Sequence, residues 1–176
     1  MRDLIIILTT LSISMSAPSG AAMAQEVQVF DGETLSLDGS VYRLYGVDAP
    51  EMDQYCIFRN RLFPCGQIAK DALTDMISES QIRCRAVRDL YTVQSEQVDN
   101  DEAVVARCTA NGYDLSKGMA DTGWAMAHPK TGQRYRAIQL NAREAERGLW
   151  RGDFVMPWEW RQGRRLPQES GTDLTN

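Results

Sequence analysis

Residues 31–34 read Asp-Gly-Glu-Thr, and after a turn at Asp38-Gly39, residues 43–51 read Arg-Leu-Tyr-Gly-Val-Asp-Ala-Pro-Glu. This stretch groups several acids and one arginine in a short hairpin and its exit. Grouped carboxylates repel one another unless a cation lies between them, and calcium is held by such oxygen ligands. An arginine beside them suits a phosphate. The alternative is a hairpin whose polar face carries solvated charges, which is the commoner situation for an arbitrary hairpin.

Short strands surround this stretch. Polar and apolar residues alternate over residues 27–29, 35–37 and 41–47, and Asp-Gly turns separate these segments, which predicts a three-stranded meander. Two more strands are predicted at residues 82–87 and 104–109, and helices at residues 66–78, 114–119 and 135–147. The polar stretch from 90 to 102 is expected to be an exposed loop. Periodicity alone therefore predicts a mixed fold that begins with strands.

The four cysteines form an even set without the spacing of a zinc site. Cys84 and Cys108 each end a predicted strand, so we expect them to pair across neighbouring antiparallel strands. Cys56 and Cys65 are then expected to close a small loop before a helix. His128 has no cysteine or second histidine near it in the sequence, so we expect a surface residue rather than a ligand or base.

The N-terminal residues have the layout of a secretory signal peptide: Arg2, an apolar run from Leu4 to Met15, and small residues ending at Ala24. The run is about a dozen residues, whereas a membrane-spanning helix needs ~20. We therefore expect cleavage after Ala24, no retained membrane anchor, and a periplasmic or secreted monomer. One domain is expected over residues 25–165, followed by a disordered tail at 166–176.

The formal net charge of −5 counts against strong binding to nucleic acid, because such proteins usually display a basic surface. Acidity of the whole chain does not exclude a local basic patch. Arginines do gather in the last third of the sequence: Arg134, Arg136, Arg143, Arg147, Arg151, Arg161, Arg164 and Arg165. We interpret most of them as solvated charges on helix faces.

The motif order resembles that of the staphylococcal nuclease (thermonuclease) family. The family pattern is Asp-Gly-Asp-Thr followed by Arg-Leu-x-Gly-x-Asp-x-Pro-Glu. Further matching segments follow in the order that secreted bacterial members show: Cys65-Gly66-x-x-Ala69, Gly112-x-Asp114-Leu115, Gly123-Trp124-Ala125, Ala142-Arg143, Arg147-Gly148-Leu149-Trp150 and Pro157-Trp158-x-Trp160-Arg161. The resemblance implies an α+β, mainly β fold, namely a five-stranded barrel of the oligonucleotide/oligosaccharide-binding (OB) type with about three helices.

The resemblance also implies a calcium-dependent nuclease site. Calcium would be held by Glu33, Asp48 and the Ala49 carbonyl, although the family has aspartate where this chain has Glu33. The extra methylene moves that carboxylate outward, which weakens a metal site. Glu51 corresponds to the residue that orients or deprotonates the attacking water, and Arg43 to one of two arginines that bind the phosphate.

The second arginine of the family is missing from both alignments of its segment. Residues 89–93, Asp-Leu-Tyr-Thr-Val, or residues 99–103, Asp-Asn-Asp-Glu-Ala, take its place. In the first alignment Tyr91 is a candidate substrate-binding residue. Arg88 and Arg107 are candidates to replace the arginine. Loss of one preorganised charge-stabilising donor typically costs ~10²–10³ in rate.

Two hypotheses follow. The first is a calcium-dependent nuclease that hydrolyses DNA or RNA phosphodiesters at a reduced rate. The second is a catalytically inactive binding module, in which the same barrel face binds an oligosaccharide, a nucleic acid or an envelope protein. The missing arginine and the acidic balance favour the second hypothesis, and the retained acids with Arg43 favour the first.

Overall fold

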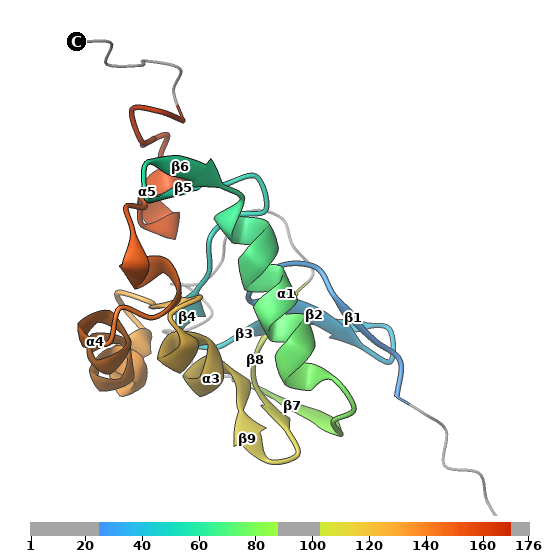
Figure 1. The fold of residues 1–176 in the computed structure, drawn as a ribbon. Coiled ribbons are helices and arrows are strands. Elements are labelled where there is room, and N and C mark those ends of the chain that lie inside the picture. Colours follow the sequence, from blue (N-terminus) through green and yellow to red (C-terminus); the bar gives the residue numbers. More distant parts are fainter. Residues whose placement is uncertain (1–24, 88–102, 170–176) are drawn as a thin grey trace, which may run out of the picture.

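The computed structural model describes residues 25–87 and 103–169 (Figure 1). The expected signal peptide, the expected loop from 90 to 102 and residues 170–176 of the expected tail lie outside this range. Within the described residues, no helix has the length and apolar character needed to cross a membrane.

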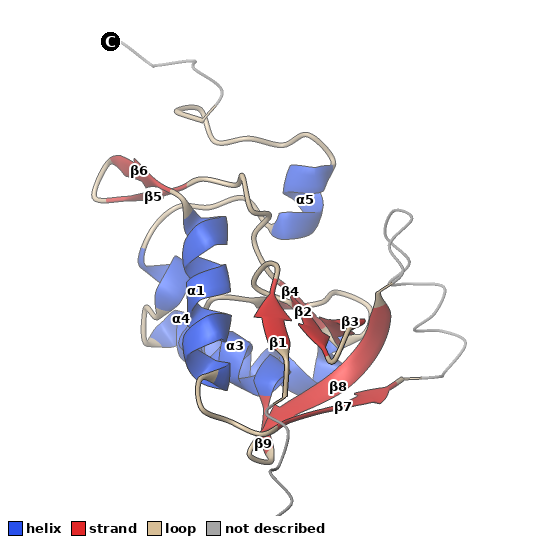
Figure 2. Ribbon diagram, turned by 90° about the vertical axis from the view of Figure 1, so that its right-hand side faces the viewer, coloured by secondary structure: helices blue, strands red, loops and turns tan. Residues whose placement is uncertain are grey.

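The fold is built on one curved sheet (Figure 2). Its strands, in spatial order, are β1 (Val27–Val29), β2 (Thr34–Leu37), β3 (Ser40–Leu44), β8 (Val104–Ala110) and β7 (Ile82–Ala86), and β9 (Tyr113–Asp114) extends it by pairing with β8. The β1–β2–β3 meander is antiparallel, as predicted, whereas β3 pairs with β8 in parallel. The five predicted strands are therefore confirmed.

The two edges of this sheet are joined by a side chain rather than by strand pairing. No backbone ladder links β1 to β7 among the described residues, so the expected barrel is not closed by backbone pairing. Instead, the Gln25 amide donates to the Ile82 carbonyl and accepts from the Ile82 N–H, both at 2.8 Å. The result is an OB-like α+β fold with an open sheet.

Three helices follow the sequence prediction: α1 (Cys65–Ile77), α3 (Leu115–Thr122) and α4 (Arg136–Glu144). Asp114 caps α3 by accepting from the Lys117 N–H at 3.0 Å, and Gly123 ends it with a φ of 77°. Single turns of 3₁₀ helix, η1 (Gly132–Tyr135) and η2 (Gly148–Arg151), flank α4.

A fourth helix, α5 (Pro157–Arg161), was not predicted. Five residues are too few to show a helical period, although Pro157 at the first helical position is a typical start. Beyond α5 the chain keeps making contacts, because Glu169 accepts a hydrogen bond from the Trp160 indole at 2.8 Å. Contacts within the described part of the chain therefore extend four residues, to Glu169, into the segment that we expected to be a disordered tail.

The core has two parts. Leu35, Leu44, Leu73 and Leu115 are fully buried between the sheet and helices α1 and α3. A second cluster joins the middle of the chain to its end, with Cys56, Cys65, Met126 and Leu149 buried, and Trp124, Trp150 and Trp158 packed against them. Burial of these side chains fixes the C-terminal segment, including α5, against the barrel.

Both expected disulfides are present, Cys56–Cys65 and Cys84–Cys108. Cys84 and Cys108 are direct partners across β7 and β8, as predicted. Cys56 and Cys65 instead enclose a β-hairpin, β5 (Cys56–Phe58) and β6 (Arg61–Phe63), where we expected a simple loop. Its turn residues Arg59 and Asn60 have φ values of 50° and 60° without a glycine, so the usual hairpin signal is missing.

We expect the protein to lose stability at high pH because of Tyr135. Its side chain is buried, and its hydroxyl donates to Asp114 at 3.1 Å. Burial, with the charge of Asp114, raises the pKa of Tyr135 from 10.0 to about 12. The folded state therefore holds this proton more tightly than the unfolded chain, and the stability present below about pH 10 is lost as the pH rises toward 12.

Urea unfolding of Tyr135→Phe measured from pH 8 to 11 checks this expectation. The variant loses about 1 kcal/mol at neutral pH with the hydrogen bond, and its stability then falls less steeply above pH 10 than that of the wild type. Tyr55→Phe, at an exposed position, is the matched control and should keep the wild-type slope. If the unfolding free energy depends on pH equally in the wild type and both variants, Tyr135 is not the group responsible for the loss of stability.

Candidate active site

The acid-rich stretch folds into one unit at an end of the sheet. Thr34 and Arg43 are direct partners on β2 and β3, and the Leu44 N–H donates to the Glu33 carbonyl at 2.7 Å. Asp31 Oδ1 accepts from the N–H groups of Glu33 and Thr34 at 2.8 and 2.7 Å, which fixes the turn that carries Glu33. The first half of the motif is thus positioned by backbone pairing.

The second half of the motif follows a glycine turn. Gly46 has a φ of 77°, and a Cβ there would lie 2.9 Å from the Tyr135 ring, so only glycine fits. After it, β4 (Val47–Asp48) pairs with β10 (Met126–Ala127). Asp48 directly faces Met126 in this pair, and its side chain is only 3% exposed.

Glu33 connects the two halves. Its Oε2 accepts from the Ala49 N–H at 2.9 Å, and its Oε1 lies 3.6 Å from Arg43 Nε. Burial, together with the negative charges of Asp48 and Asp31, raises the pKa of Glu33 well above its usual value, against the opposing effect of Arg43. The structure therefore brings Glu33, Asp48, Ala49 and Arg43 together, as the sequence analysis expected.

Arg161 of α5 makes the strongest ion pairs of this site. Its Nη1 and Nη2 donate to Asp48 Oδ1 and Oδ2 at 2.9 and 2.7 Å, and Nη1 also contacts Glu51 Oε1 at 2.5 Å. This two-pronged pairing is the geometry in which arginine binds a carboxylate best. We interpreted most of the C-terminal arginines as solvated charges, and Arg161 is an exception because it forms ion pairs with Asp48 and Glu51. No local pattern indicates the contact, since 113 residues separate Arg161 from Asp48.

The ion pairs set the charge state of the arginine. Burial alone would lower the pKa of Arg161, but the hydrogen bonds and charges of Asp48 and Glu51 raise it above its usual value. Asp48 thus has a permanent positive partner in this state. The sequence analysis expected a metal cation among the grouped acids. The Arg161 guanidinium supplies a positive charge between two of them, Asp48 and Glu51.

His128 lies near the same carboxylate. Its backbone N–H donates to the Gly46 carbonyl at 3.0 Å, and its Nδ1 lies 2.9 Å from the Thr131 hydroxyl. Burial lowers the pKa of His128, although the charge of Asp48 acts in the opposite direction. We expected a surface residue, and the structure instead shows a half-buried imidazole that interacts with Asp48 and Arg161.

The donor set fits calcium incompletely. Glu33 and Asp48 are close enough to repel each other, which favours a cation, but Arg161 already binds both oxygens of Asp48. Among residues 25–87 and 103–169, no group of three His, Cys, Asp or Glu side chains is arranged to hold a metal. Calcium prefers six to eight oxygens, so water and substrate would have to supply most of them.

The candidates for the missing arginine are only partly described. Arg88, Tyr91 and both aligned segments up to residue 102 lie outside the described residues. Arg107, on β8, extends its guanidinium over the Tyr45 ring, 4.3 Å from the ring centroid. It therefore lies against Tyr45, which directly follows the strand that carries Arg43.

Comparisons with known proteins agree with this geometry. Residues 41–152 match the family described as staphylococcal nuclease homologue. The chain is also similar to the succinoglycan biosynthesis protein ExoI of Rhizobium meliloti (strain 1021), with 28% identity over 150 residues that cover 82% of this chain and 73% of that protein. The matched range includes Arg43, Asp48, Ala49 and Glu51, whereas Glu33 and Arg161 lie outside it.

We expect Arg161→Gln to destabilise the protein by about 2 kcal/mol in chelator, because Asp48 is left buried without its cation. The loss is smaller than for a fully buried pair, since the Arg161 and Glu51 side chains are 26% and 34% exposed. Thermal and urea unfolding measure it. Arg164→Gln is the matched control, because its ion pair with Glu159 is mostly exposed and should be worth under about 1 kcal/mol. Similar losses of unfolding free energy in Arg161→Gln and Arg164→Gln would argue against the ion pair between Arg161 and Asp48.

Proposed function

This chain belongs to the staphylococcal nuclease family, and from that premise we propose that it is an exported, calcium-dependent phosphodiesterase that cleaves nucleic acid slowly. The observation that carries the proposal is the single unit formed by Glu33, Arg43 and Asp48, with Glu51 joined to Asp48 through Arg161. The unit contains the Glu51 carboxylate, which can orient or deprotonate a water molecule, and the Arg43 guanidinium, which can bind a phosphate. These are the groups that attack on a phosphodiester requires.

Each side chain has a defined task in the proposed reaction. Glu51, which is partly exposed, orients or deprotonates the water, and Arg43 binds a phosphate oxygen. Glu33, Asp48 and the Ala49 carbonyl hold calcium, which supplies positive charge near the phosphate when it is bound. The Asp31 turn and the Ala49 N–H keep the Glu33 carboxylate in place.

Arg161 accounts for the low rate in this proposal. Calcium and the guanidinium compete for Asp48, since the arginine binds both of its oxygens. Arg161 would therefore have to release Asp48 before that carboxylate could hold a metal ion. With Glu33 in place of the shorter aspartate, and without the second family arginine in the aligned segment, the site is weaker than that of active relatives.

The proposed compartment is the periplasm or the extracellular medium. Two disulfides are typical of oxidising compartments, and the N-terminal sequence has the layout of a signal peptide. We propose that the protein acts there as a monomer without a membrane anchor.

We expect calorimetry to show weak calcium binding to the wild type, and tighter binding to Arg161→Gln. Removing the arginine frees both Asp48 oxygens for the metal. Asp48→Asn should abolish the binding heat and the calcium-dependent rise in melting temperature. Arg164→Gln again serves as the control and should bind as the wild type does. If Arg161→Gln binds calcium no better than the wild type, the proposed competition between Arg161 and calcium for Asp48 is wrong.

Cleavage of single-stranded DNA by disulfide-intact protein tests the activity itself. We expect slow, calcium-dependent cleavage that chelator stops and that Arg43→Ala and Glu51→Gln each reduce by at least about a hundredfold. Activity that is indifferent to Arg43→Ala would place the chemistry elsewhere in the molecule.

A second candidate function is a binding module for an oligosaccharide. The observation that favours it is the relative whose printed name assigns it to succinoglycan biosynthesis, together with the acidic balance of this chain. Under this proposal neither the wild type nor Arg161→Gln cleaves nucleic acid. A polysaccharide ligand would then bind the wild type and lose affinity for variants of Asp48 and Glu51.

A further inference from the structure

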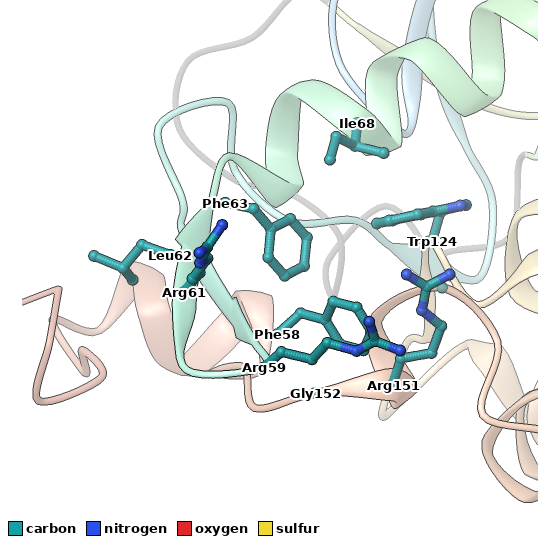
Figure 3. Close-up of a pocket in the computed structure, with 10 residues that line it drawn as sticks. Phe58, Arg59, Arg61, Leu62, Phe63, Ile68, Trp124, Arg151 and Gly152 are labelled. Carbon is teal, nitrogen blue, oxygen red and sulfur yellow. The ribbon is translucent and has the colours of Figure 1, made fainter.

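A pocket of about 880 Å³ lies beside the disulfide-braced hairpin, apart from the acid cluster (Figure 3). The β5–β6 hairpin forms one wall with Phe58 and Phe63. Trp124 lies across the space from the hairpin, Arg151 of η2 borders it beside Phe58, and Ile68 of α1 lies above the same space. Two aromatic side chains of the hairpin and the distant Trp124 therefore line one cavity.

The charges of this pocket are all positive. Arg59, Arg61 and Arg151 line it, and its described lining includes no acidic residue. The Arg59 and Arg151 guanidinium groups lie 5.1 and 4.6 Å from the centroid of the Phe58 ring. Within the described residues, none of the three arginines forms an ion pair or a hydrogen bond through its side chain, whereas Arg147, Arg161 and Arg164 each bind a carboxylate. On a chain with net charge −5, this is a local cationic patch.

The walls are held in fixed positions. The Cys56–Cys65 disulfide braces the base of the hairpin, and Ile57 pairs with Asp153 through two backbone hydrogen bonds of 2.8 and 2.9 Å. Gly152 approaches so closely that a Cβ there would lie 1.9 Å from the Ile57 carbonyl oxygen. The hairpin and η2 are therefore held in fixed positions relative to each other, so the pocket is formed before a ligand binds.

The pocket also lies close to the catalytic loop. Gly66 packs against Glu51, since a Cβ at Gly66 would lie 1.8 Å from the Glu51 carbonyl oxygen. Ile68, which lines the pocket, follows two residues later on α1, about 200° around the helix axis. The pocket and Glu51 therefore lie on different sides of the first turn of α1, and a strand that contacts both has to pass around this turn.

We propose that this pocket binds a base of single-stranded nucleic acid, with Arg59, Arg61 and Arg151 on the neighbouring phosphates. The inference rests on the proposed nuclease function and extends it with a second contact region on the same strand. Aromatic rings stack on any base, and arginines that lack carboxylate partners are free to pair with phosphates. Such a pocket would give an acidic protein a local site for a polyanion.

Fluorescence anisotropy with a labelled oligothymidylate of about ten nucleotides tests the pocket, in chelator so that nothing is cleaved. The triple variant Arg59→Ala/Arg61→Ala/Arg151→Ala should bind at least about tenfold more weakly, with a salt dependence reduced by about two in log–log slope. Arg83→Ala/Arg134→Ala/Arg136→Ala removes the same charge from exposed positions elsewhere and should bind as the wild type does. Phe58→Ala should weaken binding about tenfold and leave the salt slope unchanged.

Three results would overturn the pocket assignment: unchanged binding by the first triple variant, equal weakening by both triple variants, or an acidic polysaccharide that displaces the oligonucleotide more effectively than unlabelled oligothymidylate. Melting temperatures of the variants show that each protein is folded. Failure of the proposed function gives a different pattern. In that case the oligonucleotide still binds through the arginines, but calcium produces no cleavage by the wild type.

Discussion

The buried carboxylate of Asp48 is the constraint on which the rest of the site depends. A charge that is 3% exposed in a protein interior requires a positive partner, and Arg161 supplies it with two hydrogen bonds. This requirement makes α5 a part of the active site. The Trp-rich cluster and the hydrogen bond from the Gln54 amide to the Val155 carbonyl, at 2.7 Å, then hold the C-terminal segment where Arg161 can reach.

The site is consequently a row of charges in which two neighbouring acids lie between two arginines. Arg43 faces Glu33, Glu33 and Asp48 repel each other, and Arg161 joins Asp48 to Glu51. Such a row is stable without a metal, because every acid has an arginine or a backbone donor nearby. Under the proposed function, calcium would therefore compete with Arg161 for Asp48 instead of filling an empty site.

The hairpin enclosed by Cys56 and Cys65 connects the two functional regions. At its base, Gln54 and Cys65 lie next to Glu51 and the start of α1. The hairpin itself carries Phe58, Arg59 and Arg61, which line the pocket. Backbone bonds between Ile57 and Asp153 tie it to the segment that leads to α5. One disulfide-braced element therefore positions the catalytic loop, the cationic pocket and the helix that carries Arg161.

The amino-acid sequence by itself determined the elements with strong local patterns. Alternation and Asp-Gly turns predicted the meander, 3.6-residue spacing predicted α1 and α4, strand order predicted the Cys84–Cys108 pair, and the motif around Arg43 identified four of the site residues. Only the tertiary structure decided the partners of Arg161, the position of His128, the β5–β6 hairpin and the Gln25 hydrogen bonds that link the two edges of the open sheet. Local patterns report which backbone conformation a segment prefers and which face it buries. A contact such as Arg161 with Asp48 joins residues 113 positions apart, and a single charged side chain shows the same local pattern whether its partner is a buried carboxylate or water.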